Sequence, residues 1–110
     1  MRVAIIGSRE LDIDIPEDAV PKTATQIISG AACGIDRSAR AFALAHQIQI
    51  LEVLPDYAAF GRQAPLRRNE NIIALADLVV AFWDGKSRGT KYVIDRCRAM
   101  GKPLKVYEVR

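Results

Sequence analysis

The fold of this 110-residue chain is most constrained by short apolar runs that alternate with helical patterns. Continuous apolar runs bounded by glycine or proline are typical of strands that a parallel sheet buries on both faces. The sequence predicts strands at residues 3–6, 26–29, 48–54, 78–83 and 103–109, and helices at residues 34–46, 66–76 and 90–100. Because strands that alternate with helices form right-handed crossovers, we expect a Rossmann-like three-layer α/β sandwich with about five parallel strands.

Two connections depart from this regular pattern. Pro16 and Pro21 lie close together between the first two strands, which leaves room for one helical turn at most. The first crossover is therefore predicted to be abbreviated, with one face of the sheet thinly covered unless a partner chain covers it. Residues 56–65 form a long connection that holds Tyr57 and Phe60, and we expect a lid or wall of a site there.

Length and composition indicate a single domain over residues 1–110 in the cytoplasm. The net charge of +3 is mild and does not favour a nucleic-acid-binding protein, in which basic residues usually cluster. Cys33 and Cys97 lie far apart in a chain with one histidine, so the sequence predicts neither a zinc site nor a disulfide. No apolar run is long enough for a signal peptide or a membrane span, so we expect no membrane partner.

Four loops that follow predicted strands carry glycine, hydroxyl or arginine, at residues 7–9, 29–36, 55–69 and 84–90. Ligands of open α/β sheets bind at this edge, and backbone N–H groups, hydroxyls and guanidinium groups all suit phosphate. In the loop 29–36 a strand runs into a helix N-terminus, which is either an anion site or a tight turn packed by small residues. The loops contain neither a GxGxxG fingerprint nor a complete P-loop, so a phosphate site here belongs to another class.

The same loops carry four motifs in order: Gly7-Ser8-Arg9, Ser29-Gly30-x-x-x-Gly34-Ile35-Asp36, Arg68-Asn69 and Gly85-x-Ser87-x-Gly89-Thr90. Over almost the whole chain this order resembles the SLOG superfamily, which includes DprA/Smf, the LOG phosphoribohydrolases and the YpsA- and YspA-type domains. The chain looks most similar to the stand-alone YspA-type domains. The resemblance implies a Rossmannoid fold and a nucleotide-derived ligand, such as a nucleotide or an ADP-ribose or NAD-like compound.

Two positions depart from the patterns of these relatives. Cys33 stands where DprA-like proteins carry an arginine, and Val93 stands where LOG enzymes carry their catalytic glutamate. Because valine cannot transfer a proton, no catalytic residue is predicted. LOG-like hydrolysis of a nucleoside monophosphate stays open only if Glu70 or Asp84 replaces that glutamate. DprA-like binding of single-stranded DNA is a further alternative, and it requires a basic groove with stacking aromatic residues.

Several candidate residues also have a purely structural interpretation. Arg9 is either a ligand contact or an exposed charge, and Asp36 either contacts a nucleotide or stabilises a helix N-terminus. Arg67 and Arg68 begin a helix, where cations are disfavoured by the helix dipole unless an anion lies nearby. Thr90 either binds an anion or caps the last helix.

The sequence thus predicts binding or sensing of a small phosphate-bearing ligand, with no metal site. The predicted ligand-binding residues are Gly7, Ser8, Arg9, Ser29, Gly30, Gly34, Ile35, Asp36, Arg67, Arg68, Asn69, Gly85, Ser87, Gly89 and Thr90. The predicted helix 66–76 is apolar enough to pair with a second copy, so a homodimer is a further expectation.

Overall fold

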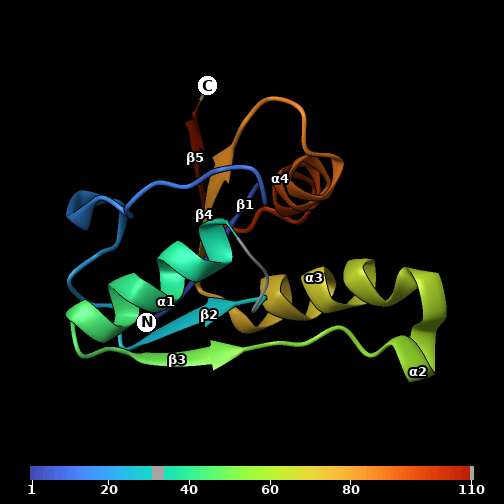
Figure 1. Ribbon diagram of the computed structural model, residues 1–110, viewed down its shortest axis with the longest axis horizontal. Helices are drawn as coiled ribbons and strands as arrows, with labels where there is room; N and C mark the ends of the chain where they lie inside the picture. Colours follow the sequence, from blue (N-terminus) through green and yellow to red (C-terminus); the bar gives the residue numbers. More distant parts are fainter. Residues whose placement is uncertain (31–33, 110) are drawn as a thin grey trace.

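A computed structural model describes residues 1–30 and 34–109 of the chain (Figure 1). Strands and helices alternate along most of the chain, as the apolar pattern predicts. The strands are β1 (Arg2–Gly7), β2 (Gln26–Ser29), β3 (Gln49–Glu52), β4 (Leu78–Trp83) and β5 (Leu104–Glu108). The helices are η1 (Glu17–Ala19), α1 (Ile35–Ala45), α2 (Tyr57–Phe60), η2 (Gly61–Gln63), α3 (Ala64–Leu75) and α4 (Arg88–Met100).

The five strands form one all-parallel sheet with the order β3-β2-β1-β4-β5. The central strand β1 pairs with β2 on one side and with β4 on the other, and Ala4 is in register with both Ile28 and Val79. The predicted Rossmann-like fold with five parallel strands is confirmed. The connection after β1 leads to β2 and the connection after β4 leads to β5, in opposite directions along the sheet, and such a switch point is where open α/β sheets bind ligands.

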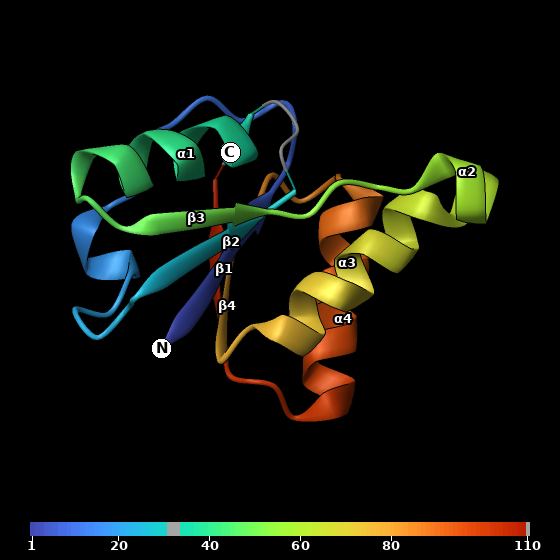
Figure 2. The same cartoon turned by 90° about the horizontal axis from the view of Figure 1, so that it is seen from below.

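Helices cover both faces of the sheet, which gives the three layers expected (Figure 2). Figure 2 shows α1 on one side of the sheet and α3 and α4 together on the other. The side chains of β1 alternate between the two cores: Val3 and Ile5 pack with α1, whereas Ala4 and Ile6 pack with α3 and α4. Because both faces are buried, the strands are almost continuously apolar, as their sequence indicates.

The connection between β1 and β2 is abbreviated, as predicted, and its only described helical turn is η1. The segment itself covers the sheet beside α1. Ile15, Ala19 and Val20 are each at most 7% exposed and belong to the same core as Phe42 of α1. The prediction of a thinly covered face is therefore wrong, because apolar residues directly before Pro16 and between Pro16 and Pro21 supply the missing layer.

Residues 56–65 differ from the predicted loop. The structure has two short helical turns there, α2 and η2, and α3 begins at Ala64 rather than at Leu66. The Asp56 carboxylate caps α2 by accepting a hydrogen bond from Ala59 N at 3.1 Å, and Pro65 lies in the first turn of α3. Both residues are helix-start signals, so the local sequence does contain the reason for the difference. Within the described ranges, no helix has the length and apolar character needed to cross a membrane.

Candidate functional site

A cavity of about 530 Å³ lies at the switch point, where β1 and β4 end. This volume is within the range of roughly 300–1,000 Å³ that is usual for small-molecule sites. Its walls come from the loops after β1, β2 and β4 and from the first turns of α1, α3 and α4. The lining residues are Ile6, Gly7, Ser8, Arg9, Glu10, Gly30, Asp36, Pro65, Arg68, Asn69, Ile72, Asp84, Lys86, Ser87, Gly89, Thr90 and Val93.

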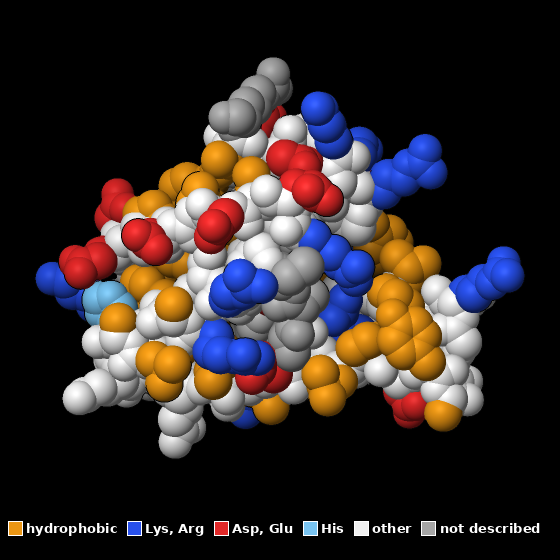
Figure 3. All heavy atoms as spheres, viewed as in Figure 1, with side chains coloured by type: hydrophobic (Ala, Val, Ile, Leu, Met, Phe, Trp, Pro, Cys, Tyr) orange, Lys and Arg blue, Asp and Glu red, His pale blue; other side chains and the backbone are white. Residues whose placement is uncertain are grey.

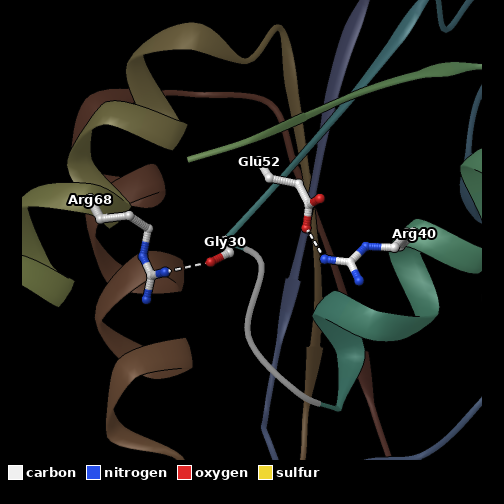
Figure 4. Close-up of polar contacts among 4 residues, drawn as sticks. All are labelled: Gly30, Arg40, Glu52 and Arg68. Carbon is white, nitrogen blue, oxygen red and sulfur yellow. Dashed lines mark hydrogen bonds and ion pairs between the residues drawn. The ribbon is translucent and has the colours of Figure 1, made fainter. Parts of the chain in front are cut away.

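Arg68 is the central charged group of this cavity. It comes from α3 and is only 9% exposed, and its Nη1 donates a hydrogen bond to the carbonyl oxygen of Gly30 at 2.9 Å (Figure 4). Its Nε donates to Asn69 Oδ1, also at 2.9 Å. A Cβ atom at Gly30 would lie 2.7 Å from Arg68 Nη1 and 3.0 Å from Asp36 Oδ2. Glycine at position 30 therefore lets the guanidinium approach the end of β2.

The electrostatic surroundings of Arg68 are unusual for an arginine. Burial lowers the pKa of its guanidinium, the nearby Asp36 carboxylate opposes this shift, and the positive charge of Arg9 adds to it. The ion pairs among the described residues are Arg40–Glu52, His46–Glu17 and Lys91–Asp95, and none involves Arg68. The cavity thus holds a buried cation on which the Asp36 carboxylate acts more strongly than the second cation, Arg9, although buried charges in proteins are normally held in a direct ion pair.

The loop after β1 is tied to the loop after β4 through Ser8. This serine is 1% exposed, its backbone N–H donates to Phe82 O at 3.1 Å, and its Oγ accepts from Asp84 N at 3.2 Å. Gly34 packs on the same loop with φ +67°, and a Cβ there would lie 2.5 Å from Arg9 O. Glycine is needed at position 34 because it combines a left-handed backbone with this close approach.

Asp84 organises the turn between β4 and α4. Its Oδ1 accepts hydrogen bonds from the backbone N–H groups of Lys86 and Ser87, both at 2.8 Å. These bonds, chiefly the one from Ser87, lower the pKa of the Asp84 carboxyl. An ionised carboxylate that already accepts two backbone N–H groups is a poor proton donor. These hydrogen bonds give Asp84 a structural role in the turn and do not favour it as a proton donor.

Ser87, rather than Thr90, caps α4. Ser87 Oγ accepts from Thr90 N at 3.3 Å and lies 3.1 Å from Thr90 Oγ1. The carbonyl oxygen of Ser87 in turn accepts from Trp83 Nε1 at 3.0 Å. The prediction that Thr90 caps this helix is wrong by three residues, because the N-cap is Ser87, directly before the first helical residue, Arg88. Both hydroxyl residues, together with Gly89, line the cavity at the positive end of the α4 dipole.

Most of the predicted ligand-binding residues meet at this cavity. The structure brings together Gly7, Ser8, Arg9, Gly30, Asp36, Arg68, Asn69, Ser87, Gly89 and Thr90. It places Ser29, Gly34, Ile35, Arg67 and Gly85 outside the cavity lining. Ile35, the first residue of α1, is buried in the core between α1 and the sheet, and the Arg67 guanidinium lies over the Phe60 ring, 5.5 Å from its centroid. Ser29 is fully buried, and its hydroxyl has no hydrogen-bond partner among the described residues.

The sequence analysis missed the apolar floor of the cavity. Ile6, Ile72 and Val93 come from β1, α3 and α4 and also belong to the core between the sheet and these helices. The strand and helix patterns predict all three residues as core, and only the SLOG resemblance, which places Val93 at the LOG glutamate position, connects one of them with a site. Glu10, Pro65, Asp84 and Lys86 complete the part of the lining that was not predicted as ligand-binding.

The remaining candidates for catalysis lie elsewhere. Glu70 accepts a hydrogen bond from the Tyr92 hydroxyl at 2.6 Å and is not among the lining residues. Cys33, the position of the DprA-like arginine, lies outside the described residues. Figure 4 shows the Arg68–Gly30 hydrogen bond together with the Arg40–Glu52 ion pair at 2.5 Å. The described residues contain no group of three or more His, Cys, Asp or Glu side chains suited to a metal ion.

Comparison of the chain with protein-family models, curated proteins and solved structures finds no match. The site is therefore interpreted from its own geometry and chemistry.

Proposed function

We propose that this chain binds a small, phosphate-bearing ligand of nucleotide-derived type in the cavity between α3 and α4. The observation that carries the proposal is Arg68, a buried guanidinium beside a second arginine and without a carboxylate at ion-pair distance among the described residues. An anion between Arg9 and Arg68 would offset both their mutual repulsion and the cost of burial.

The other walls of the cavity suit the same ligand. The start of α4 presents its positive dipole end with the hydroxyls of Ser87 and Thr90, which is a favourable environment for phosphate oxygens. Asp36 and Glu10 are carboxylates on the same lining and are acceptors for sugar hydroxyls or a base amino group. This combination of cations, hydroxyls and carboxylates fits a sugar phosphate better than inorganic phosphate alone, and it agrees with the resemblance to the SLOG superfamily.

We further propose binding rather than LOG-like hydrolysis. Val93 lies on the cavity floor at the LOG glutamate position, Glu70 is held by Tyr92, and Asp84 is held by backbone N–H groups. None of these three residues is arranged to protonate a leaving base. A DprA-like function receives no specific support, because the cavity carries acidic as well as basic side chains.

A thermal-shift and calorimetric panel of AMP, cyclic AMP, ADP-ribose and NAD tests the proposal. At least one compound is expected to raise the melting temperature of the wild-type protein, and the Arg68→Gln variant is expected to lose that shift. Arg67→Gln is the matched control, because Arg67 is the neighbouring exposed arginine outside the cavity. Absence of binding by every compound at millimolar concentration, or equal binding by wild type and Arg68→Gln, would overturn the proposal.

A further inference from the structure

The two edge strands of the sheet differ in how they are protected. At one edge, β5 begins directly after Pro103 and carries Lys105 and Glu108, both exposed. Proline and charged side chains on an edge strand hinder its pairing with another chain. At the other edge, β3 has no proline or lysine, and its one charged side chain, Glu52, is already paired with Arg40 at 2.5 Å. The edge at β3 therefore lacks the features that block pairing at β5.

The outer side of β3 is open along the backbone. In Figure 2, seen from below, β3 lies in front with α1 on one side of it, α3 on the other and no described element over it. The Val53 N–H donates to Ser29 O at 2.8 Å, so Leu51, two residues earlier, also directs its N–H and C=O toward β2. The N–H and C=O groups of Ile50 and Glu52 therefore point away from β2, to the open edge.

The side chains along this edge are mainly apolar. Leu51 is 37% exposed and Leu54 is 69% exposed, whereas Ile50 packs on the α1 side of the sheet. Because side chains alternate between the two faces of a strand, Leu51 lies on the opposite face, the side of α3. Figure 3 shows mainly uncharged side chains along the lower left edge of the molecule, where Figure 1 places β3. An open, apolar edge of this kind is a template for a further strand.

We propose that β3 pairs with β3 of a second copy of this chain, antiparallel and about a two-fold axis at Leu51, so that the two sheets join into one. The occupant is a second copy because the edge is complementary to itself in this register. Ile50 of each copy stands opposite Glu52 of the other and exchanges backbone hydrogen bonds with it. The two Leu51 side chains meet on the α3 side of the sheet, and no like charges stand opposite each other, since each Glu52 faces Ile50 and keeps its own Arg40.

This surface differs from the one that the sequence suggested for a homodimer. The helix predicted to pair, residues 66–76, corresponds to α3, and its isoleucines Ile72 and Ile73 are each 1% exposed because they pack in the core with α4. They are therefore not available to a second copy. No residue of β3 lines the cavity, so the inference does not depend on the proposed function.

Sedimentation equilibrium of the wild-type chain and of Leu51→Lys tests the pairing. Wild type is expected to reach the mass of two chains within roughly 1–500 µM, the range of weak to moderate affinities. Leu51→Lys is expected to keep the mass of one chain, because the register places the two lysines directly opposite each other. Met100→Lys is the matched control and is expected to remain a dimer, since Met100 is 51% exposed at the end of α4, which packs on β4 and β5.

Cysteine cross-linking tests the register and does not depend on how well Leu51→Lys folds. In a Cys33→Ser background that keeps the buried Cys97, Leu51→Cys places two thiols at a non-hydrogen-bonded antiparallel pair. The Cα atoms of such a pair are about 4.5 Å apart, within disulfide reach, so mild oxidation is expected to give a covalent dimer. Gln49→Cys is the matched control and is expected to stay monomeric in a denaturing gel, because its two copies lie about 13 Å apart along the strands.

Four results would overturn the inference. The first is a wild-type chain that stays a monomer over the whole concentration range, and the second is a Leu51→Lys variant that remains a dimer. Equal loss of the dimer in Met100→Lys is the third, since the effect would then follow added charge rather than the β3 edge. The fourth is a covalent dimer from Gln49→Cys and none from Leu51→Cys, because the two copies would then meet in another register.

Discussion

Replacing Arg68 with methionine separates the effect of Arg68 on the stability of the fold from its effect on ligand affinity. Methionine keeps an apolar stem of similar length but has no charge and no hydrogen-bond donor. The substitution removes the bonds to Gly30 O and Asn69 Oδ1, and hydrogen bonds of charged groups contribute about 1.5–3 kcal/mol each. It also removes the desolvation of a guanidinium that is 9% exposed, which costs several kcal/mol per buried ion.

These two contributions are of similar size and opposite sign. We therefore expect the free energy of unfolding without ligand to change by less than about 1 kcal/mol in Arg68→Met, or to rise. Burial lowers the pKa of Arg68, so folding disfavours the charged form, and stability would recover only as the pH approached that pKa. Arginine stays protonated at ordinary pH, so the effect is expected to be constant between about pH 5 and pH 9.

Ligand affinity is expected to fall in Arg68→Met, although the stability of the free protein stays the same or rises. Loss of one partner of a buried, hydrogen-bonded charge pair costs about 2–5 kcal/mol of binding free energy, which is a loss of roughly 30-fold or more in affinity. Urea unfolding followed by Trp83 fluorescence measures stability, and calorimetry with AMP measures binding, with Arg67→Met as the matched control. A loss of more than about 3 kcal/mol of stability in Arg68→Met, at unchanged ligand affinity, would refute the reasoning, because Arg68 would then be a structural residue.

Three further substitutions test the loops around the cavity. Gly34→Ala is expected to destabilise the protein by about 1–3 kcal/mol or more in urea unfolding, since its Cβ would lie 2.5 Å from Arg9 O at a φ of +67°; wild-type stability in this variant would contradict the assigned backbone. Ser87→Ala removes the α4 cap and is expected to cost about 1 kcal/mol, whereas Thr90→Val is expected to cost less, and the reverse order would assign the cap to Thr90. Asp84→Asn is expected to be less stable than wild type at neutral pH, because the folded state lowers the pKa of the wild-type carboxyl and so favours its ionised form. The difference in stability should shrink as acid protonates that carboxyl, and a difference that grows in acid would contradict the hydrogen bonds assigned to Asp84.

Local pattern was sufficient for the sheet and for most helices. β2 and β4 have the bounds that their apolar runs predict, and β1, β3 and β5 differ from the prediction by one or two residues at each end. These runs are informative because a strand buried on both faces must be apolar at nearly every position. The helical turns after Asp56 were missed although Asp56 and Pro65 are helix-start signals. The cap of α4 was assigned incorrectly because Ser87 and Thr90 compete for it and the folded backbone selects Ser87.

The direction in which the Arg68 side chain faces and the accessibility of the cavity floor could not be predicted from the sequence. The four glycine- and hydroxyl-rich loops were predicted to meet, because the carboxyl ends of parallel strands share one edge of the sheet. That Arg68 faces Gly30 while its neighbour Arg67 faces Phe60 depends on the rotation of α3 about its axis, which its packing on the sheet and on α4 sets.

The amino-acid sequence alone therefore determines the parallel α/β architecture, the edge of the sheet where the loops gather and their suitability for phosphate. Only the tertiary structure decides that the switch point is an open cavity and that Arg68 is buried there, with Arg9 in the same lining. The physical reason is that periodicity and turn chemistry act over a few residues. Burial, cavity shape and the interaction of charges instead depend on segments such as β1, α3 and α4, which lie far apart in the chain and meet only in the fold.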